Sequence, residues 1–333
     1  MKTFSSLTLI TAISVVSGLV LPGFLAVAPS AIAAPASESH SSDQITQVLN
    51  RLTYGPRPGD YEKVRSLGVQ RFIQAQLNPS SIAESPKVVA QLERSASVRT
   101  VPSSQLLLQF QMVKKERKAA KNKNGDDKGT AQGVALAGEN GSGVVIKEFG
   151  KKGVKTLNGD ANLRNKIETG VIETKILRAV ESPRQLNELM ADFWFNHFNI
   201  SIGKGVDKVL IGPYEEQALR PYLLGNFRDM LGATMHHPAM MFYLDNAQNT
   251  KAGYQSPNPK NKKNGLNENY ARELLELHTL GVDGGYSQKD VMELARVLTG
   301  WGLPGGRKTS GAGAYWASFD EQRHDFGDKG ILG

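Results

Sequence analysis

Apolar residues recur three and four positions apart along most of this sequence, a spacing that places them on one face of an α-helix. Ile45, Val48, Leu49 and Leu52 follow this pattern, and the same spacing returns near the C-terminal end. No segment shows the sustained two-residue alternation that a large sheet requires, and no internal repeat is evident. We therefore expect an all-α, multi-helix globular domain with long polar insertions and at most minor β structure.

Helix boundaries are marked by capping residues and by Gly and Pro. Ser182-Pro183 is a typical helix start, and Ser287 with Asp290 approximates a capping box. A polar stretch at 246–266 is predicted to be a loop. Helices are predicted at 45–52, 60–67, 69–77, 162–180, 182–197, 207–224, 227–235, 238–244, 267–280 and 287–298.

The first residues have the composition of a secretory signal peptide. A basic start at Lys2 precedes an apolar run at 7–27, and Ala31 and Ala33 form the A-x-A arrangement of a signal peptidase site. The predicted organisation is a signal peptide at 1–33, a flexible stub at 34–43 and one helical domain at 44–333. An uncleaved anchor is the alternative, but Pro22-Gly23 interrupts the run, so no stable membrane span is expected after signal removal. We therefore expect a periplasmic or extracellular protein.

Charge and cysteine content restrict the partners. The chain has no cysteine, which excludes disulfides and thiolate chemistry, and its formal charge is +8. Much of the basic excess falls within and beside 119–160, a segment whose composition predicts a mobile insertion. Basic clusters attract anionic envelope polymers, whereas the lack of interleaved aromatic residues argues against nucleic acid.

Four segments concentrate side chains able to do chemistry. His197 lies four residues after Phe193 and is predicted to share its apolar face. A histidine in such a position either hydrogen-bonds backbone groups in the core or has a ligand or catalytic role. Glu273 and Glu276 share a face of the 267–280 helix, on which Leu277 and His278 are expected in the core. This pair is interpreted as a surface ladder, a buried network or half of a metal site.

The third segment contains His324-Asp325, an imidazole beside a carboxylate. The fourth segment is His236-His237, which precedes Pro238. Two consecutive histidines on a helix point in different directions and do not easily share one metal, so the pair is interpreted as a helix boundary before Pro238. Zinc-protease, serine-hydrolase, phosphate-loop and dinucleotide-binding motifs are all absent.

The order of these motifs resembles one family of bacterial proteins. The chain carries Leu-Thr-Tyr-Gly-Pro-Arg-Pro at 52–58, Phe-Trp-Phe-Asn-His-Phe at 193–198, the 267–281 helix motif, Leu-Thr-Gly-Trp at 298–301 and His-Asp-Phe-Gly-Asp-Lys at 324–329. This set is similar to the bacterial "domain of unknown function 1800" family, which has no established activity. Phe195 stands where family members often have histidine, and the resemblance implies that further sequence follows the last motif.

Two functions are compatible with these observations. The first is a noncatalytic scaffold or partner-binding protein of the cell envelope, which contacts other exported proteins or an anionic polymer and uses its polar motifs structurally. The alternative is a metal-dependent extracytoplasmic hydrolase. It requires a divalent metal, with His197, Glu273, Glu276, His324 and Asp325 as candidate catalytic and metal-binding residues that converge on one pocket.

The signal peptide prediction has a direct measurement. We expect N-terminal sequencing of the exported protein to begin near Ala33 or Ala34, because the A-x-A site follows the apolar run. Exported protein that still begins at Met1 would refute cleavage.

Overall fold

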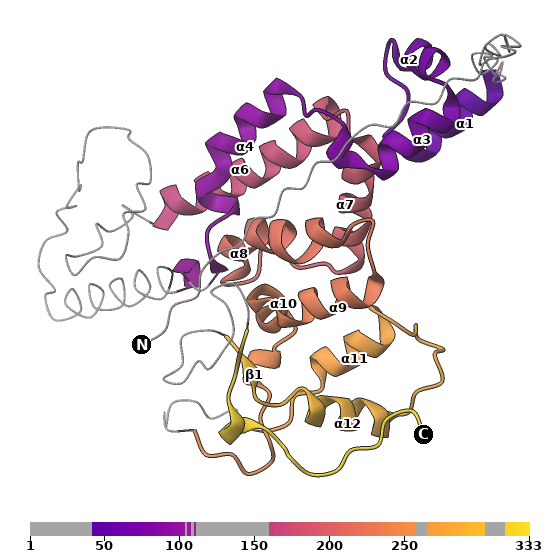
Figure 1. Ribbon diagram of the computed structural model, residues 1–333. Coiled ribbons are helices and arrows are strands. Elements are labelled where there is room, and N and C mark those ends of the chain that lie inside the picture. Colours follow the sequence, from indigo (N-terminus) through magenta and orange to yellow (C-terminus); the bar gives the residue numbers. More distant parts are fainter. Residues whose placement is uncertain (1–41, 104, 108–109, 111–159, 257–264, 304–316) are drawn as a thin grey trace, which may run out of the picture. The chain divides into compact units, whose positions relative to one another are not determined.

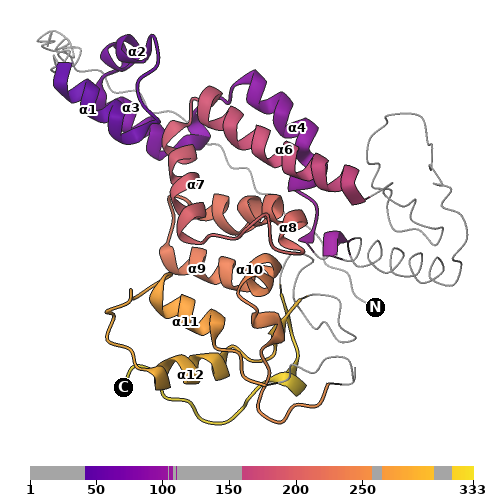
Figure 2. The same cartoon turned by 180° about the vertical axis from the view of Figure 1, so that it is seen from behind.

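The computed structural model describes residues 42–103, 105–107, 110, 160–256, 265–303 and 317–333, with backbone alone at 160–166. These residues belong to one compact unit, His40–Gly333. They are mostly helical, and β1 and β2 form a two-stranded sheet (Figures 1 and 2). The all-α prediction is therefore confirmed. The predicted signal peptide, most of the stub and nearly all of the basic insertion lie outside the described residues.

The helices are α1 (Ser42–Leu52), α2 (Asp60–Leu67), α3 (Val69–Leu77), α4 (Pro86–Arg99), α6 (Asp160–Glu181), α7 (Gln185–His197), α8 (Asp207–Tyr214), α9 (Phe227–His236), α10 (Pro238–Tyr243), α11 (Asn269–Glu276) and α12 (Gln288–Val297). Short helical turns occupy Pro79–Ser81, Glu215–Leu219, Arg220–Tyr222, Asn246–Gln248 and Glu321–Arg323. Strands β1 (Trp301–Gly302) and β2 (Ser318–Phe319) pair antiparallel, with Trp301 opposite Phe319.

The first three helices enclose a small core of their own. Their inward residues are Ile45, Leu49, Val64, Val69 and Phe72. The turn that follows α1 attaches this group to α7, since the Tyr54 hydroxyl donates to the Glu188 carbonyl at 3.0 Å. The Leu-Thr-Tyr-Gly-Pro motif therefore has a structural use in joining these helices to the main core.

Helices α4 and α6 lie side by side in both views (Figures 1 and 2). Small residues permit this close approach: Ser95 and Thr174 share a hydrogen bond of 3.0 Å, and a Cβ on Gly170 would lie 3.3 Å from Val98. Helix α8 packs against both helices through Gly212. The main core continues from here to α12 and includes the buried rings of Phe198, Tyr214 and Tyr270.

Several predicted boundaries are confirmed and others are wrong. Helices α2 and α3 occupy their predicted ranges, and Ser287 and Asp290 form the capping box of α12. Helix α7 begins at Gln185 and not at Ser182, because Ser182 is fully buried and its hydroxyl bonds the Arg184 N–H and Glu84.

The other two differences concern helix ends. The predicted 207–224 helix is divided by a π-helical turn at Glu215–Leu219, and α11 stops at Glu276. Among the described residues, no helix combines the length and hydropathy needed to cross a bilayer.

We expect Gly212→Ala to lower the free energy of unfolding by about 1–3 kcal/mol, because overpacking a tight contact forces backbone shifts. The new Cβ would lie 2.8 Å from the Val98 carbonyl oxygen and 3.0 Å from a Val171 methyl group. The matched control is Gly232→Ala in α9, where nothing lies within 4 Å. That change should stabilise by about 0.5–1 kcal/mol through helix propensity. Equal effects in urea unfolding would show that the α4–α8 contact is not tight.

Candidate functional site

His197 ends α7 within a cluster of aromatic rings. Its Nε2 lies 3.1 Å from the His278 carbonyl oxygen, and its ring lies 4.6 Å from Phe198 and 5.6 Å from Trp194 between centroids. Phe227 of α9 is also within 6.3 Å. We call Phe193, Trp194, His197, Phe198 and Phe227 the α7–α9 aromatic cluster.

The outer edge of this cluster is exposed to solvent. Phe193 is 56% exposed and Phe227 is 41% exposed. The prediction that Phe193 and His197 share a core face is therefore wrong for Phe193. The buried side chains of α7 include Leu186, Glu188 and Ala191, whereas Phe193 near the end of the helix faces solvent.

His278 lies at the inner edge of the cluster, 6.3 Å from the His197 ring. It is buried as predicted, and its Nδ1 has no hydrogen-bond partner among the described residues. Burial, reinforced by His197, lowers the pKa of His278 to about 4. Its imidazole is therefore neutral at pH 7.

The α11 glutamates lie on a helix that is shorter than predicted. Glu273 and Glu276 are both half-buried, and burial together with Glu276 raises the pKa of Glu273, against the opposing charge of Arg272. Leu277 is 59% exposed, which corrects its predicted core position. Helix α11 ends at Glu276, and a wide turn follows in which the Leu280 amide donates to the Leu275 carbonyl five residues back.

His324 and Asp325 are held by the Leu-Thr-Gly-Trp segment and α12. The His324 Nδ1–H donates to the Thr299 carbonyl at 2.7 Å. The Arg296 guanidinium donates to both carboxylate oxygens of Asp325, at 2.8 and 3.2 Å. These hydrogen bonds lower the pKa of Asp325 to about 2. Gly300 has φ +88°, and a Cβ there would lie 2.9 Å from the Asp320 carbonyl oxygen. Only glycine fits this turn without strain.

His236 and His237 point to different partners, as expected. His237 is buried; its Nδ1 accepts from the Ala239 amide and caps α10, while its Nε2 lies 3.0 Å from the Ser103 hydroxyl. Burial lowers the pKa of His237 to about 3. The His236 Nδ1–H donates to the Gly232 carbonyl at 2.8 Å.

The five predicted site residues thus fall into local groups. His197 contacts the His278 carbonyl, Glu276 raises the pKa of Glu273, and His324 directly precedes Asp325 in the sequence. Within the described ranges, no three His, Asp or Glu side chains are grouped so as to hold a metal ion. The metal-site assignment remains a prediction from sequence.

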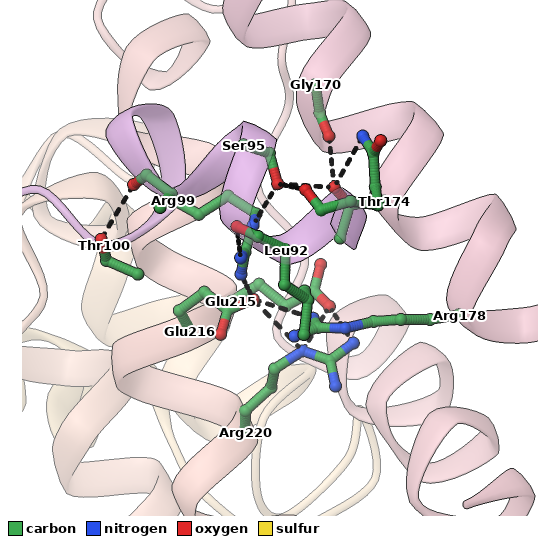
Figure 3. Close-up of polar contacts among 12 residues, drawn as sticks. Leu92, Ser95, Arg99, Thr100, Gly170, Thr174, Arg178, Glu215, Glu216 and Arg220 are labelled. Carbon is green, nitrogen blue, oxygen red and sulfur yellow. Dashed lines mark hydrogen bonds and ion pairs between the residues drawn. The ribbon is translucent and has the colours of Figure 1, made fainter. Parts of the chain in front are cut away.

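A network of buried charges joins several helices, and sequence reasoning did not single it out. Arg220 binds both oxygens of Glu188, at 3.0 and 2.7 Å, and contacts Glu215 at 2.8 Å. Glu216 accepts from Arg178 at 2.8 Å (Figure 3). These side chains come from α6, α7 and the turns after α8, so the network joins segments that are distant in sequence.

Arg99 extends this network to α4. Its guanidinium bonds Glu216, the Ser95 hydroxyl at 2.8 Å and the Leu92 carbonyl at 2.9 Å (Figure 3). We call Arg99, Arg178, Arg220, Glu188, Glu215 and Glu216 the α4–α8 ion network; it balances three positive against three negative charges.

Both Glu188 and Glu216 stay ionised in this environment. Burial by itself would raise the pKa of each carboxyl group, but the neighbouring arginines outweigh it and hold both pKa values below the ordinary 4.5. Neither group is poised to exchange protons near neutral pH. The network is therefore suited to holding helices together and not to acid–base chemistry.

One signal in the sequence could have indicated this network. Glu215, Glu216 and Arg220 occur within an otherwise apolar segment, at spacings of four and five residues that allow pairing along a helix. Their partners lie far away in the sequence. Arg99 is 117 residues from Glu216, and Glu188 is 32 residues from Arg220, so no local pattern indicates these pairs.

Comparison with known proteins identifies a family without an assigned activity. A family model described as "Protein of unknown function (DUF1800)" matches residues 47–333, nearly the whole described chain. No curated protein matches the sequence. No solved structure matches it either.

We expect Arg220→Met to lower the free energy of unfolding by about 3–5 kcal/mol at pH 7, because it leaves buried carboxylates unpaired. Lys87→Met is the matched control, since it removes the exposed Lys87–Glu181 pair. That change should cost less than about 1 kcal/mol. An Arg220→Met loss no larger than that of the control, measured by urea unfolding, would contradict a structural role for the network.

The network also predicts loss of stability in acid. Because the pKa values of Glu188 and Glu216 are lower in the folded protein than 4.5, their contribution is complete above that pH and disappears as pH falls through the folded values. We expect Glu188→Gln to be less stable than wild type at pH 7 and to lose less stability between pH 6 and pH 3. Parallel urea midpoints across this range would show that the carboxylate is not linked to folding.

Proposed function

We propose that this chain, which belongs to the DUF1800 family of proteins of unknown function, is an exported, noncatalytic protein of the cell envelope that binds another exported protein. The observation that carries this proposal is the exposed edge of the α7–α9 aromatic cluster. Phe193 and Phe227 present large apolar surfaces to solvent, and the rings behind them are packed in the core.

Aromatic side chains at a surface favour binding when they are held rigidly. Trp194 is in ring contact with Phe193 at 4.9 Å and with Phe227 at 5.8 Å, and its Nε1–H donates to the Leu223 carbonyl. Preorganised rings lose little conformational entropy on binding and dominate the energetics of protein interfaces. A contiguous apolar area of this kind typically marks an interaction site.

The polar motifs support the same proposal. His324 bonds the Thr299 carbonyl, Asp325 is paired with Arg296, and His237 caps a helix. Each of these groups has a structural partner inside the chain, as the scaffold hypothesis requires. The signal peptide that the sequence predicts at residues 1–33 supports export.

Photocrosslinking in the native host tests partner binding. We expect benzoylphenylalanine at position 193 or 227 to give one discrete crosslinked product, because these rings would lie against the partner. Position 176 on α6 is the matched control, since Ile176 is also apolar and exposed. The product formed from position 227 should disappear in the Phe193→Ser background. Absence of a product at both cluster positions, or the same product from position 176, would refute the proposal.

The alternative, a metal-dependent extracytoplasmic hydrolase, makes a different prediction. Metal analysis of the purified protein would then give one equivalent of a divalent ion, which His197→Ala or Asp325→Asn would remove. That outcome would favour the enzyme over the binding protein.

A further inference from the structure

Asp207, the first residue of α8, has a carboxyl group without a hydrogen-bond partner among the described residues. It is fully buried, and neither Oδ1 nor Oδ2 has a hydrogen-bond partner within the described part of the chain. Its amide donates to the Lys204 carbonyl at 2.9 Å, so the backbone turn before α8 is well formed. The lack of a partner therefore concerns the side chain alone.

An ionised carboxylate in this position would be costly, because burial removes water without supplying a donor. Burial raises the pKa of Asp207 to about 8; the positive charge of Lys204 opposes the shift and the negative charge of Asp245 adds to it. Tyr214 lies on the same helix, and its pKa is raised by burial, by Tyr270 of α11 and by Asp207 when that group is ionised. Asp207 is thus a neutral acid at pH 7.

Lys204, the cation that opposes this shift, is bonded to other groups. The Lys204 ammonium donates to the Tyr243 carbonyl at the end of α10 and pairs with Asp245 at 3.5 Å. It also lies 5.3 Å from the centroid of the Tyr243 ring. The Lys204 side chain is 38% exposed, so solvent reaches it on one side. The Lys204 ammonium therefore interacts electrostatically with two carboxyl groups: it pairs with Asp245 and lowers the pKa of Asp207.

The turn that carries Lys204 is packed tightly on α10. Gly205 has φ +45°, and a Cβ at this position would lie 2.6 Å from the Phe242 ring. A change in the bonding of Lys204 would therefore act directly on the contact between α8 and α10, which is part of the main core.

We propose that Asp207 and Lys204 form an alkaline switch: loss of the Asp207 proton to solvent draws the Lys204 ammonium from Tyr243 and Asp245 toward the new carboxylate and loosens the α8–α10 contact. Below the transition, Lys204 joins the turn before α8 to the end of α10. Above it, the same ammonium neutralises a charge inside the core. The device is independent of the proposed partner binding.

The sign of the pH dependence follows from linkage. The folded-state pKa of about 8 exceeds the ordinary value of 3.8, so the folded protein binds the proton more tightly than the unfolded chain. The associated stability is complete below pH 3.8 and is lost progressively as pH rises to about 8. Asp207→Asn keeps the shape of the neutral acid and removes the titration.

Two measurements on the full chain test this switch. We expect the Asp207 ¹³Cγ signal to titrate with a midpoint near pH 8, with a parallel change at the Lys204 ¹³Cε signal. The urea midpoint should fall between pH 5 and pH 9 in wild type and fall much less in Asp207→Asn. The matched control is Asp325→Asn, because the pKa of Asp325 is about 2 and this group does not titrate in that range.

A midpoint near pH 4 for Asp207 would overturn the proposal, since the carboxyl group would then be ionised throughout. An unchanged Lys204 signal across the Asp207 transition would overturn the exchange of partners. Lys204→Met should move the Asp207 midpoint to higher pH, because it removes the charge that favours ionisation. A shift to lower pH would contradict the assigned role of Lys204.

Discussion

Glu216 is the charge on which the arrangement of the central helices depends. It lies between Arg99 of α4, Arg178 of α6 and Arg220 of the turn after α8, and the Arg99 and Arg220 guanidinium groups are also bonded to other groups. Buried ions are stable only when their charges and hydrogen bonds are matched, so this carboxylate fixes where three segments meet. The small residues Ser95 and Gly170 let α4 and α6 approach closely enough to place their arginines there.

Polar side chains elsewhere in the core stabilise irregular backbone. The Asn246 side chain donates to the Leu298 carbonyl at 3.1 Å, and that of Asn249 donates to the Ala295 carbonyl at 2.8 Å. Arg323 donates to the Ala247 carbonyl at 2.7 Å in the same region. These bonds satisfy carbonyls at the end of α12 and in the loop after α10. The polar motifs that distinguish the sequence thus have a structural role in the C-terminal half.

Part of the candidate site was predictable and part was not. The sequence correctly placed His278 in the core and separated His236 from His237, because both inferences depend on residues within one helical turn. It wrongly placed Leu277 in the core and Phe193 on the inward face of α7. Those errors arose where tertiary packing overrides helical periodicity. Helix α11 ends one turn early, and α7 buries Glu188 against Arg220 while Phe193 faces solvent.

By itself the sequence determined the helical class, the bounds of α2 and α3, and the capping box of α12, because propensity, caps and breakers act within a few residues. Only the tertiary structure decided which charges meet. Arg99 and Glu216 are 117 residues apart, and Tyr54 reaches Glu188 across 134. It also decided that the Asp207 carboxyl group has no hydrogen-bond partner in the described part of the chain, and that Phe193 and Phe227 face solvent. Burial and pairing at such separations depend on how whole helices pack, and local sequence patterns do not encode that packing.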